Sequence, residues 1–297
     1  MLQTAPIALF VYNRPEHTRQ TIEGLRANPL ASESELTVFS DGPKSELDQA
    51  SVSQVRDYLS TIDGFRKISV IHREKNSGLA KSIIAGASEV LDRSGRIIVL
   101  EDDIVTAPGF LTYMNQGLEA YERNRSIFAI CGWSPPIDIP ASYRHDVYLV
   151  HRAMCWGWAS WADRWQKIDW EVRDYAQFEK DREAQKKFAR GGEDLPDMLR
   201  NALSGRVNSW AIRWAYAQFR QGALSVAPTK SLTDNVGMDG SGVNCSPSEQ
   251  FVVTANKKQL SFEFPAVLEE NPVISASFQK FFSYNLRGKI KKALGLL

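Results

Sequence analysis

Residues 96–103 have the sequence Arg-Ile-Ile-Val-Leu-Glu-Asp-Asp, an apolar run that ends in three consecutive acids. A run such as Ile97 to Leu100 is typical of a strand buried on both faces of a parallel sheet. Ligands of open α/β sheets bind just outside the carboxyl ends of such strands, where Glu101, Asp102 and Asp103 would lie. Carboxylate oxygens there suit Mg²⁺ or Mn²⁺ carrying a phosphate. The alternative is a solvated acidic turn that favours the start of the next helix.

Working outward, strand-like and helix-like patterns alternate through the first half of the chain. Pro15 suits the first position of a helix, and the residues from Leu47 to Ile62 have the spacing of one helical face. Right-handed connections between such elements predict an α/β fold with a doubly wound, mostly parallel, Rossmann-like sheet. The expected strands cover residues 7–12, 36–40, 68–72, 97–100 and 127–131.

The pattern changes after residue 132, where three prolines and a group of tryptophans follow. We therefore divide the chain into an α/β half, 1–132, and a second half, 133–297. Helices are expected over 180–190 and 209–220. Residues 231–248 are rich in Gly, Ser and Asn and predict a long loop, and loops of this length are usually lids or binding loops.

The composition shows no strong electrostatic bias. The 297 residues allow one large or two modest domains. Because 36 Lys and Arg nearly cancel 35 Asp and Glu, we expect no nucleic-acid binding driven by long-range attraction. The 3 cysteines are far apart, which favours a reducing cytoplasm over a disulfide framework. We expect no signal peptide, and no apolar stretch approaches the ~20 residues that span a bilayer.

Two further strand ends carry polar residues. Asn13 and Arg14 follow the first expected strand, and Asp41 follows the second. Asn13 and Asp41 could hydrogen-bond the edge of a nucleobase. Their alternative roles are a helix cap for Asn13 and a turn for Asp41 with Gly42.

After the third strand, Arg73 is followed by Asn-Ser-Gly-Leu-Ala-Lys over residues 76–81. Gly78 would allow close backbone approach, and the helix start would face an anion. Arg73 and Lys81 are therefore candidate partners of a diphosphate, although a solvated lysine needs no ligand. Ionised Asp102 and Asp103 would repel each other, so we expect a metal ion to offset their charge.

The order of these motifs resembles that of GT-A glycosyltransferases of the family 2 type, and Glu-Asp-Asp is similar to the motif of N-acetylglucosaminyltransferase I. The resemblance covers nearly the whole chain and implies the nucleotide-diphospho-sugar transferase fold, with an acceptor-side C-terminal half and one catalytic domain overall. It also implies that Asp103 binds Mn²⁺ or Mg²⁺, that Asp102 lies near the ribose and that Glu101 faces the donor sugar. Asn13 and Asp41 would line the nucleobase pocket.

The second half resembles bacterial relatives of this group. Trp156, Gly157 and Trp158 could hold a sugar, because its apolar face can lie on an indole while backbone groups reach its hydroxyls. Most of the tryptophans are nevertheless expected in the core. The shared motifs are Cys-Trp-Gly-Trp-Ala-Ser-Trp at 155–161, Ser-Trp-Ala-Ile-Arg-Trp at 209–214 and Asn-Val-Gly-Met-Asp-Gly-Ser-Gly at 235–242.

An inverting transfer needs a base for the acceptor hydroxyl. The resemblance places it near 206–214, where Asn208 stands instead of an acid, and an amide is not a base. Asp194 resembles the acidic position before the acceptor-side helix, and Asp239 on the Gly-rich segment is a third candidate. Residues 234–244 resemble a lid that orders over the nucleotide. Residues 278–297 form a basic amphipathic pattern that suits either an anionic membrane or docking on the domain.

These observations predict a metal-dependent glycosyltransferase, a hexosyl- or N-acetylhexosaminyltransferase, that uses a UDP- or GDP-sugar. The resemblance implies a carbohydrate or lipid-linked glycan acceptor, a role in bacterial surface polysaccharide biosynthesis and a cytoplasmic location, at most peripheral to the inner face of the plasma membrane. A sugar-phosphate nucleotidyltransferase should carry a Gly-rich basic loop after the first strand, which is absent here. The other alternative is a noncatalytic glycan- or nucleotide-binding protein that retains the fold.

Overall fold

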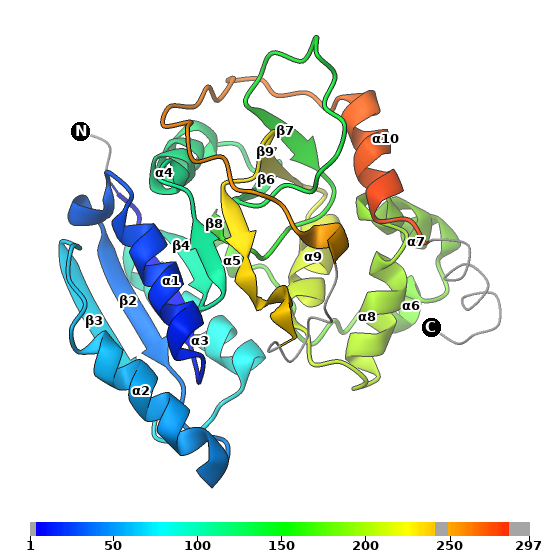
Figure 1. Cartoon of the computed structure of the whole chain (residues 1–297). Coiled ribbons are helices and arrows are strands. Elements are labelled where there is room, and N and C mark those ends of the chain that lie inside the picture. The colour runs from blue at the N-terminus through cyan, green and yellow to red at the C-terminus, as the bar shows by residue number, and fades with distance from the viewer. Residues whose placement is uncertain (1–3, 241–248, 285–297) are drawn as a thin grey trace.

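The computed structural model describes residues 4–240 and 249–284. Its centre is an eight-stranded sheet with the order β3-β2-β1-β4-β8-β6-β9-β7 (Figure 1). The strands are β1 Ile7–Val11, β2 Glu35–Ser40, β3 Lys67–His72, β4 Arg96–Glu101, β6 Ile127–Cys131, β7 Val147–Val150, β8 Trp158–Trp161 and β9 Leu224–Pro228.

The sheet is mostly parallel, as expected. β1 pairs in parallel with β2 and β4, β2 with β3, and β6 with β9. β8 is antiparallel to both β4 and β6, and β7 is antiparallel to β9. The strands β7 and β8 therefore run against the other six, and β6 keeps the direction of β4.

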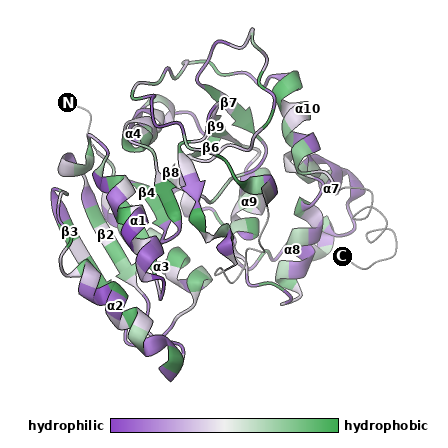
Figure 2. Ribbon diagram, in the orientation of Figure 1, coloured by the Kyte–Doolittle hydropathy of each residue, from purple (hydrophilic) through white to green (hydrophobic). Residues whose placement is uncertain are grey.

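Helices cover both faces of the sheet because alternate strand side chains point to opposite faces. Leu9 packs with residues of α1, α2 and α4, whereas Phe10 packs with residues of α3 and α9. Apolar residues concentrate in the central strands, and the helices carry polar residues on their outer sides (Figure 2). These helices are α1 Pro15–Arg26, α2 Gln49–Leu59, α3 Leu79–Ser94, α4 Phe110–Tyr121 and α9 Trp210–Arg220.

The second half does not form a separate sheet. Its strand β8 lies between β4 and β6 of the first half, so the boundary at residue 132 divides the sequence rather than the sheet. Helices α6, α7 and α8 share a further apolar cluster with α9, and α10 packs beside β7. The bounds are α5 Ala162–Trp165, α6 Tyr175–Phe178, α7 Arg182–Phe188, α8 Leu195–Leu203 and α10 Pro272–Phe281, with 3₁₀ helices η1 Ala31–Glu33, η2 Glu46–Asp48 and η3 Ala189–Gly191.

Three expectations about individual segments are corrected. Leu47 is 92% exposed, so it does not belong to the buried face of α2. Within the expected loop 231–248, the described residues 231–240 are not structureless, because β10 Thr233–Asn235 pairs antiparallel with β5 Ile104–Thr106 and η4 Val236–Asp239 follows directly. Of the helix expected over 278–297, only 278–281 are helical among the described residues, as the end of α10 Pro272–Phe281, which buries Phe278. The rest of that expectation, 285–297, lies outside the described residues, as do 241–244 of the expected lid.

Among the described residues, no helix combines the length and the apolar character needed to cross a membrane.

Candidate active site

The carboxyl ends of three neighbouring strands bring the candidate residues to one edge of the sheet. β1 lies between β2 and β4, with Val11 opposite Ser40 and Phe10 opposite Glu101. The residues that follow these strands therefore start side by side. Arg14 comes from the turn after β1, Asp41 from the turn after β2, and the acidic pair from the turn after β4.

Arg14 bridges the two adjacent aspartates. Its Nη2 donates to Asp103 Oδ2 at 2.9 Å and also contacts Asp102 Oδ1, and its Nε donates to Asp102 Oδ2 at 3.4 Å. The sequence predicted that a metal ion offsets this double negative charge. The structure adds a guanidinium to the same place, because Arg14, at the N-cap of α1, lies opposite the end of β4.

The carboxyl groups of the triplet share a crowded environment. Burial among protein atoms and the charges of Asp103 and Asp102 raise the pKa of Glu101 to about 8, against the opposing effects of Arg14 and the Trp210 side chain. Burial also raises the pKa of Asp102, although the charge of Arg14 opposes that shift. Trp210 is the first residue of α9, so the N-terminal end of this helix lies beside Glu101.

The segment 235–239 covers the aspartates. Val236 N–H donates to the Asp103 carbonyl at 2.9 Å. A Cβ added to Gly237 would lie 2.2 Å from Asp103 Oδ2 and 3.0 Å from Arg14 Nη1, so only glycine permits this close approach. Arg14 Nη1 is buried and has no hydrogen-bond partner among residues 4–240 and 249–284, which leaves this nitrogen available as a donor beside the acidic pair.

Asp239 belongs to the same cover. It lies at the end of η4, and its Oδ2 is 3.2 Å from Nε2 of His17 on α1. Asp239 is among the residues predicted from the sequence, whereas His17 is not. A weak signal was present, because His17 follows Arg14 by three residues and therefore falls on the same side of the first helical turn.

A second cluster forms around Asp41. Its carboxylate accepts hydrogen bonds from the backbone N–H groups of Ser77 and Gly78 at 3.0 to 3.1 Å, and from the hydroxyl of Ser82 at 3.4 Å. Arg73 Nη1 donates to the same hydroxyl at 2.5 Å. Asp41, Arg73 and Gly78 are therefore brought together, with Ser82 as a connecting residue that the sequence analysis had not singled out.

Two other candidates lie outside these clusters. Asn13 does not cap α1; its side chain donates to Asp48 Oδ1 at 2.9 Å, on the far side of the turn after β2. Lys81 is exposed on the first turn of α3. The glycine before this helix, Gly78, has φ of 78°, a conformation that favours glycine.

The tryptophan motif divides between the site and the core. Trp158 has 0% exposure and packs against Trp165 and Trp214, so its ring contacts other aromatic side chains and has no surface left for a sugar. Trp156 is half-buried, and its carbonyl accepts from the Thr233 hydroxyl at 2.9 Å. This bond ties Trp156 to the strand that leads into η4.

Gly157 fills a narrow space beside this strand. It has φ of 75°, and an added Cβ would lie 3.0 Å from the Thr233 side chain and 3.1 Å from Phe110. The residue is buried, so a sugar would not reach it directly in this conformation.

The remaining base candidates have different settings. Asp194 forms a two-pronged ion pair with Arg152 at 2.8 to 3.0 Å, and Arg152 also lies over the Phe282 ring. Through Arg152, Asp194 therefore connects the start of α8 with the end of α10. Asn208 is exposed in the turn before α9, two residues from Trp210.

The donor atoms fit a divalent cation held by one protein carboxylate. Asp103 is 8% exposed, and its Oδ1 accepts no hydrogen bond from the described residues. In residues 4–240 and 249–284 no group of three or more His, Cys, Asp or Glu side chains converges on a common point. Mg²⁺ commonly uses one or two carboxylates, with water and substrate phosphates as its other ligands.

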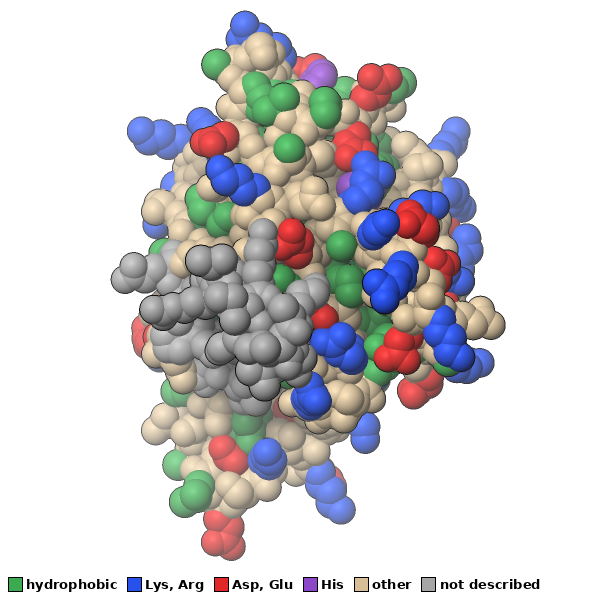
Figure 3. Space-filling view, turned by 90° about the vertical axis from the view of Figure 1, so that its right-hand side faces the viewer, with side chains coloured by type: hydrophobic (Ala, Val, Ile, Leu, Met, Phe, Trp, Pro, Cys, Tyr) green, Lys and Arg blue, Asp and Glu red, His purple; other side chains and the backbone are tan. Residues whose placement is uncertain are grey.

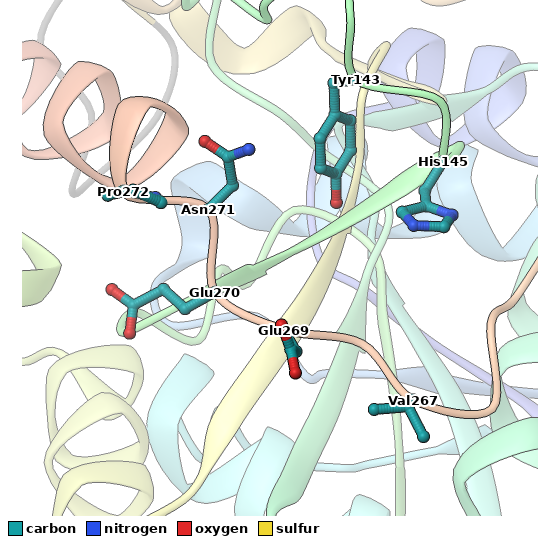
Figure 4. A pocket seen from close by; sticks show the side chains of 7 residues that line it. All are labelled: Tyr143, His145, Val267, Glu269, Glu270, Asn271 and Pro272. Carbon is teal, nitrogen blue, oxygen red and sulfur yellow. The ribbon is translucent and has the colours of Figure 1, made fainter.

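Two cavities lie away from this edge, in the second half. One of about 280 Å³ is lined by residues before β7 and before α10, including Tyr143, His145 and Glu269 (Figure 4). A larger one of about 680 Å³ lies among α6, α7 and α8.

Comparisons with known proteins agree with the family expected from the sequence. The model of "Glycosyl transferase family 2" matches residues 7–177. An alpha-1,3-mannosyl-glycoprotein 2-beta-N-acetylglucosaminyltransferase of Arabidopsis thaliana is 23% identical over 189 residues, which are 57% of this chain and 42% of that protein. The match therefore spans less than half the length of this relative.

Solved structures with partial similarity include two that hold nucleotide sugars. Mannosyltransferase PcManGT from Pyrobaculum calidifontis, in complex with GDP-Man and Mn²⁺, is 10% identical with a TM-score of 0.38, over 57% of this chain and 50% of that chain. A UDP-glucose pyrophosphorylase complexed with UDP-glucose is 10% identical with a TM-score of 0.39, over 75% and 90%. Because the family model covers more than half of the 297 residues, the chain belongs to glycosyl transferase family 2.

Proposed function

We propose that this protein is a metal-dependent glycosyltransferase that moves a sugar from a UDP- or GDP-sugar to a carbohydrate acceptor. The observation that carries the proposal is the edge where Asp102 and Asp103 follow β4 beneath Gly237, with the unpartnered Nη1 of Arg14 beside them. Membership of glycosyl transferase family 2 supports the reaction class.

The donor would lie along the ends of β2, β1 and β4. Asp41, Arg73 and Gly78 would bind the nucleoside and its phosphates, and Arg14 Nη1 would donate to a phosphate oxygen. Asp103 would hold Mn²⁺ or Mg²⁺, which supplies several kcal/mol of stabilisation to the charge on a leaving diphosphate. Glu101, beside Trp210, would face the transferred sugar.

The transfer would proceed with inversion. The acceptor oxygen attacks the anomeric carbon, the bond from that carbon to the diphosphate breaks, and a carboxylate takes the hydroxyl proton. Asp239 is the best-supported base candidate, because it belongs to the segment that covers Asp103. Asp194, in contrast, forms an ion pair with Arg152. The cover formed by η4 would also exclude water and so limit hydrolysis of the donor.

We propose that the acceptor is a lipid-linked glycan in bacterial surface polysaccharide biosynthesis. The sequence of residues 285–297 supports it, since four Lys or Arg and five Leu or Ile would suit the anionic inner face of the plasma membrane.

The test is a screen of UDP- and GDP-sugars for release of the nucleoside diphosphate, with and without Mn²⁺, on wild type and Asp103→Ala. We expect release from one donor that requires Mn²⁺ and falls at least about a hundredfold in the variant, because a ligand that stabilises the leaving group by several kcal/mol is lost. Nucleotide or glycan binding without release from any donor, with candidate acceptors present, would instead support a noncatalytic protein, the alternative to which Asn208 points.

A further inference from the structure

The larger cavity of the second half is separate from the donor edge. It has a volume of about 680 Å³ and lies among α6, α7, η3, α8 and the chain after α10. Its volume is in the usual range of ~300 to 1,000 Å³ for small-molecule sites. Figure 3 shows the side of the molecule that carries α7 and α8, where hydrophobic side chains are surrounded by a mixture of Lys, Arg, Asp and Glu.

The charges of the cavity balance. Its edge carries Arg182 and Lys186 together with Glu179 and Glu193. In the described part of the chain Arg182 forms no ion pair, so its guanidinium can donate to a ligand. Glu179 and Glu193 would repel a nucleic acid or an anionic membrane. Arg182 and Lys186 would repel a cationic ligand. A neutral ligand with many hydroxyl groups can use both signs, because each hydroxyl both donates and accepts.

The deepest polar group of the cavity is already satisfied. Asp197 is 4% exposed, and its two oxygens accept from Arg200 Nη2 at 2.7 Å and from the Tyr284 hydroxyl at 3.0 Å. A ligand therefore needs no positive charge to compensate a buried carboxylate. This pairing also fixes the position of the Tyr284 ring at the wall.

Aromatic rings supply the apolar part of the lining. Tyr175 and Tyr284 are half-buried, and Phe178 is buried beside them. The hydroxyl of Tyr175 donates to Glu179 Oε1 at 3.3 Å, which orients the ring. Aromatic faces bordered by fixed polar groups suit the apolar C–H face and the hydroxyl edge of a sugar ring.

The cavity is connected to the proposed active site through two packed helices. Its helix α8 packs against α9 through Leu199, Ala202 and Ile212, and α9 begins at Trp210 beside Glu101. The wall of the cavity and the start of α9 beside Glu101 are therefore held by the same packed helix pair.

We propose that this cavity binds a neutral sugar unit of the acceptor at a distance from the unit that reacts. This inference rests on the proposed function, whose acceptor is a carbohydrate, and adds the site that recognises acceptor length. Arg182 would donate to ring hydroxyls, Glu179 and Glu193 would accept from them, and the tyrosines would contact the ring face.

The test uses the full-length protein chain. The ligands are neutral oligosaccharides of increasing length, drawn from glucans, mannans and N-acetylglucosamine oligomers. Ala189→Trp would fill the cavity and Arg182→Ala would remove an exposed donor, because both residues line it. Lys187→Ala is the matched control, an exposed residue of α7 outside the lining. Saturation-transfer NMR without donor should show binding that both lining variants weaken at least about fivefold and the control leaves unchanged.

Kinetics separate this inference from the function on which it rests. In both lining variants the KM for long acceptors should rise at least about fivefold, while the KM for short acceptors and for the donor stays at the wild-type value. Equal KM values in wild type and Arg182→Ala, with normal nucleotide release, would overturn the cavity proposal alone. Absence of nucleotide release from wild type would count against the proposed function, and NMR binding would still decide whether the cavity holds a sugar.

Discussion

At the scale of single residues, the site depends on how Arg14 is paired. Its guanidinium contacts both aspartates after β4, and its Nη1 has no partner in the part of the chain that the structure describes. The sequence located the acids correctly at a strand end, since four apolar residues precede them. It could not assign Arg14 to them, because 88 positions separate Arg14 from Asp102 and only the register of β1 with β4 brings the two turns together.

This pairing predicts that Arg14 competes with a divalent cation for Asp103. Arg14→Gln removes a positive charge from the coordination environment while keeping a side chain that hydrogen-bonds. A unit charge near a divalent ion costs on the order of several kcal/mol at an effective dielectric constant of about 20. We therefore expect the variant to bind Mn²⁺ at least about tenfold more tightly, measured by electron paramagnetic resonance without donor.

Arg73→Gln is the control, since Arg73 contacts the Asp41 cluster and not the aspartates after β4. It should leave the Mn²⁺ affinity at the wild-type value. Circular dichroism checks that both variants fold. Unchanged or weaker Mn²⁺ binding by a folded Arg14→Gln variant would show that the bridge does not oppose the cation.

At the scale of elements, the periodicity of apolar residues predicted the first half well. The five expected strands and the helices between them are present within a few residues. The strands β5, β7, β8, β9 and β10 were missed because they are short and their partners are distant in sequence. β10 consists of Thr-Asp-Asn, which has no apolar alternation, and it exists as a strand through its backbone pairing with β5.

The docking of α10 predicts a dependence of stability on pH. Glu270 precedes this helix, and its carboxylate contacts His151 Nε2 at 3.1 Å and Arg190 Nη2 at 2.8 Å. Burial and the charge of Arg190 lower the pKa of His151 below its usual 6.5, although Glu270 opposes the shift. The unfolded chain therefore binds the proton first as the pH falls through 6.5, and stability decreases below that pH.

Glu270 adds a second decrease at lower pH. Burial raises its pKa, but the hydrogen bond from Ser275 and the charges of His151 and Arg190 outweigh this effect, and the pKa lies below 4.5. Its contribution is lost as the pH falls below 4.5.

Urea unfolding at pH 7.5 and 5.5 isolates the His151 effect. We expect wild type to lose more stability than His151→Gln over this interval, because the unfolded chain takes up the His151 proton at a higher pH than the folded protein does. An equal loss in both proteins would contradict the assignment to His151.

At the scale of the whole molecule, one sheet joins both halves of the chain. β8 from the tryptophan-rich half lies next to β4, and α9 from the same half places Trp210 beside Glu101. The sequence predicted which polar residues lie where β1, β2 and β4 end, because these residues directly follow periodic strands. The cover by Gly237, the pairing of His17 with Asp239 and the burial of Trp158 depend on contacts between distant segments, which composition and spacing do not encode.

The central claim is that a nucleotide with its metal binds where β1, β2 and β4 end. Hydrogen–deuterium exchange of the full chain with Mn²⁺ and either UDP or GDP, compared with Mn²⁺ alone, tests it most directly. We expect one nucleotide to slow exchange in 12–14, 41–42, 76–79, 102–103 and 234–239, with no change in α6, α7 and α8. Slowed exchange in other segments, with these five unchanged, would contradict the account.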